Sequence, residues 1–263
     1  AGEFLAMVAA PPCSTFSICR FIDSPRSGGR GAPVVRTREH IMGIPNVDPR
    51  HARELLQANE IVRRMCIMLH VAHAAGSEFV IENPIDRGDP TRRTKFFHKD
   101  HGPLWSMPEV ITLMSVCDCS SVNFSQCRFG APARKDTTFV FTQGFSAILT
   151  PLHDMSCDHA PHEHERPAGG DVDEDGNWLS DEHSTFPPAL NYFIAQAVTN
   201  VALQHGPVTE PISKGSPASI RKAEPTPPAK VPLLSRLRPH HLTKLVLMNA
   251  MSYRHSLVLT LIH

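Results

Sequence analysis

The sequence has no long hydrophobic run and no excess of charge of either sign. No stretch reaches about 18 uninterrupted apolar residues, so no transmembrane span and no membrane partner are expected. Lysine plus arginine equals aspartate plus glutamate, at 26 residues each in a chain of 263, and the formal net charge is zero. This balance excludes a whole-protein electrostatic argument for nucleic-acid binding, so only local basic patches can support one. A hydrophobic content of 41% and a charged content of 20% are typical of a globular protein.

The seven cysteines do not form the regular spacing of a disulfide framework, and no secretory hydrophobic segment precedes them. The sequence therefore predicts an intracellular, reducing compartment and leaves nucleus and cytoplasm undecided. The chain begins at Ala1, without a methionine and directly before a strand-like run. We expect it to be truncated at its N-terminus.

The first third of the chain predicts a strand, a long helix and a second strand. The run "FLAMVAA" is typical of a short buried strand, which must end at Pro11 because proline cannot donate to a sheet ladder. Asp48 and Pro49 predict a helix start, and Gly76 follows the last apolar residue at helical spacing. The run "EFVIENP" predicts the next strand. This βαβ order requires two parallel strands, so "PPC" and "ENP" are expected at the same edge of the sheet.

The remainder predicts a helix from Pro108, the strands "SVNF" and "TTFVFT", and an amphipathic helix "PPALNYFIAQAVTNVAL". The predicted fold class is an α/β sheet flanked by helices, with loop-rich insertions, over a single domain of residues 1–204. The proline-rich segment 205–232 predicts a linker, because it lacks the apolar residues that a core requires. The apolar tail 233–263 is interpreted either as a docking helix or as the start of a different module.

A thiol and a carboxyl group at neighbouring strand ends favour covalent catalysis assisted by an acid. Cys13 would serve as the nucleophile if nearby arginines favoured its thiolate. Partial burial of Glu82 would raise its pKa and keep it protonated, able to donate to a ring nitrogen. Cytosine needs this pair, because carbon 5 becomes nucleophilic only after a thiolate adds at carbon 6 and N3 accepts a hydrogen bond or a proton. The alternatives are a buried structural cysteine and a helix-capping carboxylate.

Several ordered motifs carry a resemblance to a known family. The stretches "PPCSTFS", "IENP" and "QCRFGAPARKDTTFVFT" resemble the catalytic half of the cytosine-5 DNA methyltransferase family. "ENPIDRGD", "HGPLW", "QCRFGAPARKDT" and "FPPALN" resemble its divergent, phage-like members that are carried by mobile elements. The resemblance covers about residues 4–204. It implies a methyltransferase-type, Rossmann-like sheet, S-adenosylmethionine as methyl donor, and double-stranded DNA with a flipped cytosine as partner.

The resemblance also implies roles for individual residues. Cys13 would attack carbon 6 of the base, and Glu82 would contact N3 and the exocyclic amine. Arg128 would hold the O2 side, with Gln126 supporting the turn that carries it.

Three neighbours of these motifs complete the predicted substrate-binding set, namely Ser14, Arg20 and Asn83. The loop after Cys13 is rich in arginine and would close over the flipped base and touch phosphates. Its arginines are Arg26, Arg30, Arg36 and Arg38.

The sequence departs from the family pattern in three places. Proline replaces the valine of the Glu-Asn-Val motif, and Gly130 stands where the second arginine of the third motif is expected, with Arg134 and Lys135 nearby. The glycine-rich motif that cradles the cofactor is absent and is expected upstream of Ala1, so the cofactor-binding residues are unassigned. An alternative is therefore a decayed methyltransferase fold that acts as an interaction module of a mobile-element polyprotein.

A second constellation is the run "CDHAPHEH", which places four zinc-type ligands close together. They are Cys157, His159, His162 and His164, and we expect a cysteine from position 117 or 119 to join them. A solvated histidine-rich loop is the alternative, and Cys127 is interpreted as a packing residue. If zinc binds here, a non-catalytic, zinc-stabilised nucleic-acid-binding domain becomes a further alternative for the whole chain.

Overall fold

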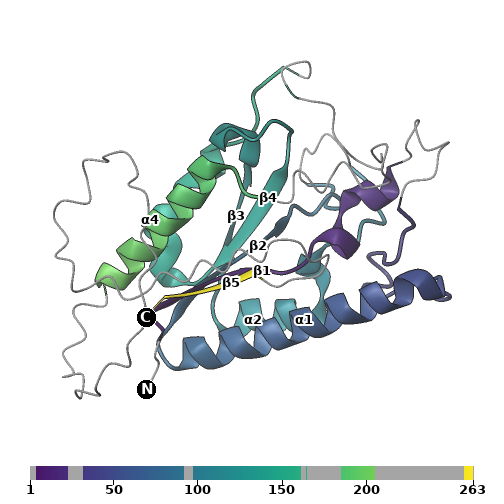
Figure 1. Cartoon of the computed structure of the whole chain (residues 1–263), viewed down its shortest axis with the longest axis horizontal. Coiled ribbons are helices and arrows are strands. Elements are labelled where there is room, and N and C mark those ends of the chain that lie inside the picture. The colour runs from purple at the N-terminus through teal and green to yellow at the C-terminus, as the bar shows by residue number, and fades with distance from the viewer. Residues whose placement is uncertain are drawn as a thin grey trace, which may run out of the picture.

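A mixed sheet lies between two layers of helices in the computed structural model (Figure 1). Helices α1 and α2 cover one face of the sheet, and α4 covers the other. This arrangement confirms the α/β sheet flanked by helices that the sequence predicts. The structure describes residues 4–22, 32–91, 97–160, 164, 185–204 and 258–262.

The sheet has five strands in the order β3-β4-β2-β1-β5. Strands β1 and β2 are parallel, and each of the other neighbouring pairs is antiparallel. The strands are β1 (Ala6–Ala10), β2 (Glu78–Pro84), β3 (Ser120–Ser125), β4 (Asp136–Phe141) and β5 (Val258–Ile262).

Helix α1 (Pro49–Ala74) connects the two parallel strands and confirms the predicted βαβ unit. Asp48 caps it, because the carboxylate accepts a hydrogen bond from the backbone N–H of Arg50 at 2.9 Å. Pro49 fits the first turn, where a backbone N–H has no intrahelical partner. Gly76, with φ at 93°, turns the chain from the helix into β2.

The other predicted helices are also present, and short helical turns join them to the strands. Helix α2 begins at Pro108 and α4 begins at Pro188, as their sequences predict. The remaining elements are α2 (Pro108–Val116), α3 (Ser146–Leu149), α4 (Pro188–Gln204), η1 (Ser14–Phe16), η2 (Ile18–Phe21), η3 (Leu104–Ser106), η4 (Gln126–Phe129), η5 (Gln143–Phe145) and η6 (Thr150–Asp154).

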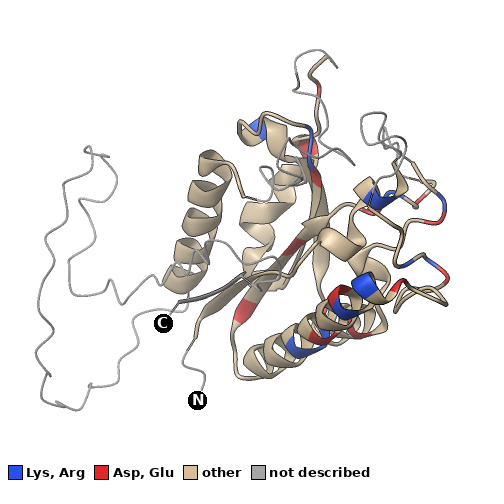
Figure 2. Cartoon of the chain, turned by 45° about the vertical axis from the view of Figure 1, so that its right-hand side comes forward, with Lys and Arg blue, Asp and Glu red and all other residues tan. Residues whose placement is uncertain are grey.

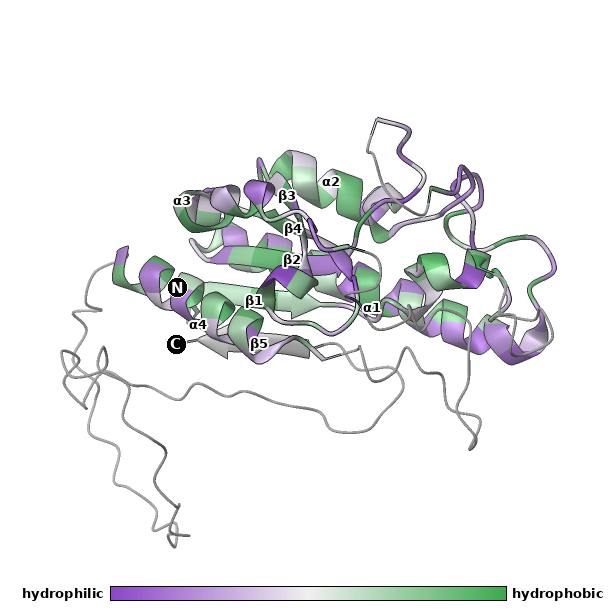
Figure 3. Ribbon diagram, turned by 90° about the horizontal axis from the view of Figure 1, so that it is seen from above, coloured by the Kyte–Doolittle hydropathy of each residue, from purple (hydrophilic) through white to green (hydrophobic). Residues whose placement is uncertain are grey.

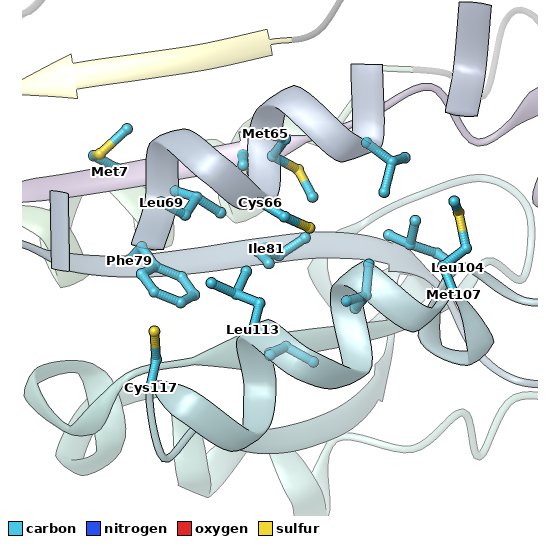
Figure 4. Close-up of a cluster of buried hydrophobic side chains, with 14 of the residues drawn as sticks. Met7, Met65, Cys66, Leu69, Phe79, Ile81, Leu104, Met107, Leu113 and Cys117 are labelled. Atoms are coloured by element: carbon cyan, nitrogen blue, oxygen red, sulfur yellow. The ribbon is translucent and has the colours of Figure 1, made fainter. Parts of the chain in front are cut away.

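The core consists of two clusters, one on each face of the sheet, because successive side chains of a strand point to opposite faces. Phe79 and Ile81 of β2 pack against α1 and α2, where Figure 4 shows them beside Leu69 and Leu113. The apolar residues of α1 recur between polar ones, and the helix alternates between green and purple along its length in Figure 3.

The opposite face of β2 carries the side chains of Val80 and Glu82. Val80 belongs to the cluster under α4, together with Phe139 and Phe141 of β4. Glu82 lies two residues beyond Val80, and its neighbour Ile81 belongs to the cluster under α1 and α2. The period of a strand therefore directs the Glu82 side chain to the α4 side of the sheet.

The tail contributes a strand rather than a docking helix over residues 258–262. Strand β5 pairs antiparallel with β1, with Val8 opposite Thr260. The predicted linker 205–232 lies outside the described residues. Within the described part of the chain, none of the helices combines the length and the hydropathy that crossing a bilayer requires.

Candidate functional site

Cys13 and Glu82 belong to the same edge of the sheet. Ala9 pairs with Ile81, so the chain leaves β1 toward Cys13 at the level where β2 reaches Glu82. Asn83 ties the two strand ends together, because its side-chain Nδ2 donates to the backbone oxygen of Pro11 at 3.1 Å. Cys13 immediately precedes η1 and is partly exposed, as a group that meets a substrate must be.

The Glu82 carboxyl group is buried and is held by polar neighbours. Only 5% of the residue is exposed. Gln126 Nε2 lies 3.4 Å from Glu82 Oε1 and donates to the Thr137 hydroxyl at 2.9 Å. The Thr137 side chain also hydrogen-bonds to Glu82. Gln126 and Thr137 therefore fix the position of the acid from the neighbouring β3–β4 hairpin.

Burial raises the pKa of Glu82, although Lys135 and the hydrogen bond from Thr137 act in the opposite direction. Burial also raises the pKa of the Cys13 thiol, with a further increase from Glu82 and a decrease from Lys135. Lys135 therefore acts on the pKa of both groups, and Glu82 acts on that of Cys13. Burial therefore shifts both the acid and the thiol toward their neutral forms.

None of the described arginines is among the groups that shift the pKa of Cys13. The basic group that lowers the pKa of Cys13 is Lys135, and the net shift is upward because burial dominates. Arg20 instead forms an ion pair with Glu54 at 2.7 Å and donates to the Ser14 carbonyl. The Ser14 hydroxyl donates to the same Glu54 carboxylate at 2.8 Å. Ser14 and Arg20 therefore anchor the loop after Cys13 to α1.

Arg36 and Arg38 also have partners within the chain. Arg36 is 1% exposed, stacks on the Phe16 ring, and donates to Thr15 and Asn59. Arg38 forms an ion pair with Asp86. Arg26 and Arg30 lie outside the described residues. In Figure 2, basic and acidic residues alternate on α1, where Glu60 pairs with Arg63 and Arg64.

Arg128 lies on the same turn as Gln126 but has a different partner. Its guanidinium group forms an ion pair with Asp158, and the Arg128 residue is exposed. The structure thus brings Gln126 to Glu82 and places Arg128 toward the segment that carries Cys157. Asn83 is fully buried, and its Oδ1 atom has no hydrogen-bond partner among the described residues.

The "ENPIDRGD" and "HGPLW" segments bind each other beside the site. Trp105 Nε1 donates to the Pro84 carbonyl at 2.9 Å, directly after Glu82 and Asn83. The backbone N–H of Arg87 donates to His101 Nδ1 at 3.1 Å, so the ring proton lies on Nε2 and donates to the Phe16 carbonyl at 2.9 Å. These contacts join the end of β2 to the loop after Cys13.

The ionisation of Asp86 predicts how the unfolding free energy depends on pH. Burial alone would raise the pKa of Asp86, but the neighbouring His101 ring and the hydrogen bonds from Arg38 and the Gly88 N–H outweigh burial and lower the pKa from 3.8 to about 2. A depressed carboxyl pKa contributes stability above the unfolded value, and this contribution is lost as the pH falls toward the folded value. Between pH 5 and about pH 3, Asp86→Asn should therefore lose less unfolding free energy than the wild type, by at most about 1 kcal/mol after allowance for partial exposure.

Urea unfolding of both proteins at several pH values measures this difference. Asp154→Asn is the matched control, because Asp154 is exposed at the end of η6. Equal acid sensitivity of Asp86→Asn and the wild type would contradict the role given to this carboxylate.

The structure brings Cys157, His159 and His164 together, but with a different upstream cysteine from the predicted one. The ligand atoms of Cys127, Cys157, His159 and His164 all lie within 4.8 Å of one another and could hold a metal ion. The upstream cysteine in this cluster is Cys127, which is also buried, and not the cysteine at position 117 or 119 that the sequence predicts. Cys117 is buried in the core under α1 and α2, where Figure 4 shows it near Phe79, and Cys119 packs against that cluster. His162 lies outside the described residues.

The sequence pattern does not single out two residues that complete the site. In the sequence, Lys135 stands out only as a basic residue near Gly130, and Thr137 only as part of the predicted strand "TTFVFT". The run "QCRFGAPARKDT" contains both, and η4 folds back so that the Gln126 N–H donates to the Lys135 carbonyl at 2.9 Å. The motif therefore contains both residues, and the β3–β4 hairpin brings Lys135 next to Gln126.

No family model, no curated protein and no solved structure matches the chain. The described residues also offer no glycine-rich turn for a nucleotide-like cofactor after β1 or β2. Pro11 and Pro12 follow β1. Gly88, the first glycine after β2, packs against the Arg38 side chain and the backbone of His98. These residues do not fit the cradle that S-adenosylmethionine requires.

Proposed function

We propose that this chain activates carbon 5 of cytosine in DNA, as the base-activating part of a cytosine-5 DNA methyltransferase. The observation that carries the proposal is the position of Cys13 and Glu82 at one edge of the sheet, with Lys135 lowering the pKa of both. A parallel βαβ pair with helices on both faces is compatible with a Rossmann-like sheet of the methyltransferase type. Such sheets bind their ligands beyond the carboxyl ends of the strands, where Cys13 lies.

The first chemical step is the addition of the Cys13 thiolate to carbon 6 of a flipped cytosine. The thiol proton leaves to solvent, and a sulfur–carbon bond forms as the double bond between carbons 5 and 6 shifts toward carbon 4. The electron pair reaches N3, which takes the proton of the neutral Glu82 carboxyl group. The raised pKa of Glu82 suits this role, because an ionised carboxylate has no proton to donate.

Lys135 and Gln126 support the step electrostatically and geometrically. Once Glu82 has lost its proton, the Lys135 charge stabilises the carboxylate in a site where water is scarce. Gln126 keeps Oε1 of Glu82 in place through a contact at 3.4 Å. Carbon 5 of the adduct is now an enamine carbon and takes a proton or another electrophile.

The proposal is tested by hydrogen exchange at carbon 5, which needs the adduct but no methyl donor. A library of DNA duplexes covering all sequence contexts is incubated with the protein in deuterium oxide, digested and analysed by mass spectrometry. Deoxycytidine should gain one deuterium per exchanged site above the protein-free control. Thymidine serves as an internal control because its carbon 5 carries a methyl group.

The absence of deuterium gain in every context would contradict the proposal. Exchange in single-stranded RNA but not in DNA would also contradict it, because the substrate would then be a different nucleic acid. The alternative of an interaction module without chemistry is favoured by the missing glycine-rich turn and predicts no exchange on either substrate.

A further inference from the structure

The Cys/His cluster has the dimensions of a tetrahedral zinc site. Cys157 Sγ lies 3.4 Å from His164 Nε2 and 3.7 Å from His159 Nδ1. Zinc bonds of about 2.3 Å to sulfur and about 2.0–2.1 Å to nitrogen place tetrahedral ligand atoms about 3.3–3.8 Å apart. The remaining separations stay within 4.8 Å. Small side-chain rotations are therefore enough to close four ligands around one ion.

The ligand set selects the metal. Two thiolates and two imidazoles favour zinc over the hard cations calcium and magnesium, which prefer oxygen ligands. Cys127 and Cys157 are both free thiols, and the rings of His159 and His164 stand perpendicular with centroids 5.1 Å apart. One cysteine comes from η4, and the other ligands come from the segment after η6.

Hydrogen bonds hold both cysteine-bearing segments in place from outside the cluster. The Cys157 N–H donates to the Ser125 hydroxyl at 2.9 Å, and that hydroxyl donates to Asp136. Asp136 forms a buried ion pair with Arg87 at 2.9 Å. Outer partners of this kind orient metal ligands. The end of β3 thus fixes the position of Cys157 relative to Cys127.

The turn η4 carries a different contact at each of three successive positions. Gln126 contacts Glu82 and Thr137, Cys127 belongs to the Cys/His cluster, and Arg128 pairs with Asp158 next to Cys157. A metal ion bound to Cys127 therefore restrains the residue that stands against Glu82. We propose that Cys127, Cys157, His159 and His164 bind one Zn²⁺, and that this ion fixes the η4 turn so that Gln126 is positioned against Glu82.

The first experiment measures metal content and ligand identity without any substrate. Protein purified in zinc-containing medium should hold about one equivalent of zinc, and cobalt should replace it with the visible absorption and thiolate charge-transfer bands of a tetrahedral site. Cys157→Ser should weaken cobalt binding by more than the about 10- to 100-fold that loss of an outer partner costs. Cys157→His should restore binding, because it returns a ligand. Cys119→Ser is the matched control and should bind like the wild type.

His159→Ala is a second ligand variant, and because His159 is exposed the substitution should not disturb folding. It should also weaken cobalt binding while the far-ultraviolet circular dichroism stays unchanged. A protein that takes up no cobalt, equal binding by Cys157→Ser and the wild type, or a Cys127–Cys157 disulfide found by mass spectrometry under reducing purification would each overturn the metal site.

The positioning role is measured by amide hydrogen exchange with and without the metal. Removal of zinc should reduce the protection of the Gln126 and Ala131 amides, which donate to the carbonyls of Lys135 and Gln126. The amides of α1 serve as the internal reference. Unchanged protection around η4 after zinc removal would overturn the positioning role. Both experiments are independent of the chemistry of Cys13, so their failure and the failure of carbon 5 exchange are distinguishable.

Discussion

Cys13→Ser should abolish deuterium exchange at carbon 5 of cytosine, with a loss of at least about 10³-fold relative to the wild type. A serine hydroxyl is a far weaker nucleophile than a thiolate, and no histidine base is placed against residue 13 by the contacts of the described residues. The substitution removes little volume from a partly exposed position, so the unfolding free energy should stay within about 0.5 kcal/mol of the wild type.

Cys19→Ser is the matched control for this variant. Cys19 is also partly exposed and lies in η2, the helical turn that Arg20 anchors to Glu54. It should retain wild-type exchange. Equal exchange by Cys13→Ser and the wild type would remove the nucleophile from the account, whatever the effect of Cys19→Ser.

Glu82→Gln should reduce the same exchange by about 10²- to 10⁴-fold, the range for loss of a general acid. Glutamine keeps the shape and can still donate a hydrogen bond to N3, but it has no proton to transfer. The Gln126 amide can turn to face the new side chain, so the buried site loses little stability. Glu78→Gln is the matched control, because Glu78 starts the same strand and accepts a hydrogen bond from the Gly144 N–H at 3.1 Å.

The pH profile separates the role of Glu82 from a purely structural one. The exchange rate follows the product of the Cys13 thiolate and the neutral Glu82 populations, so it should rise with pH, level off and then fall. Glu82→Gln should keep the rising limb and lose the falling limb, because glutamine does not titrate. A variant that keeps both limbs would contradict the acid role.

The βαβ part of the fold could be predicted because its signals are local. Prolines end β1, Asp48 and Pro49 start α1, and Gly76 ends it, so each boundary is written within a few residues. The parallel pairing of β1 and β2 then follows from the order of elements alone. The same order of elements places Cys13 and Glu82 at one edge of the sheet.

The partners of charged and sulfur-containing residues could not be predicted in the same way. Arg36 looks like a basic residue of a polar loop in the sequence, but Thr15, Asn59 and the Phe16 ring enclose it. Cys127 lies beside an arginine in a strand-flanking run, and only the return of the chain after η6 brings Cys157 to it. Such contacts depend on non-local pairing, which the periodicity of a sequence does not encode.

The central claim is that the Cys13 sulfur forms a covalent bond to carbon 6 of a pyrimidine held against Glu82. Its most direct test is intact-protein mass spectrometry after incubation with DNA that carries 2-pyrimidinone in place of cytosine, a base that accepts a thiolate without a methyl donor. We predict an adduct of one protein and one strand, with the modified peptide mapped to Cys13 and a strong decrease in Glu82→Gln. An adduct on a different cysteine, or none with the wild type, would contradict the account.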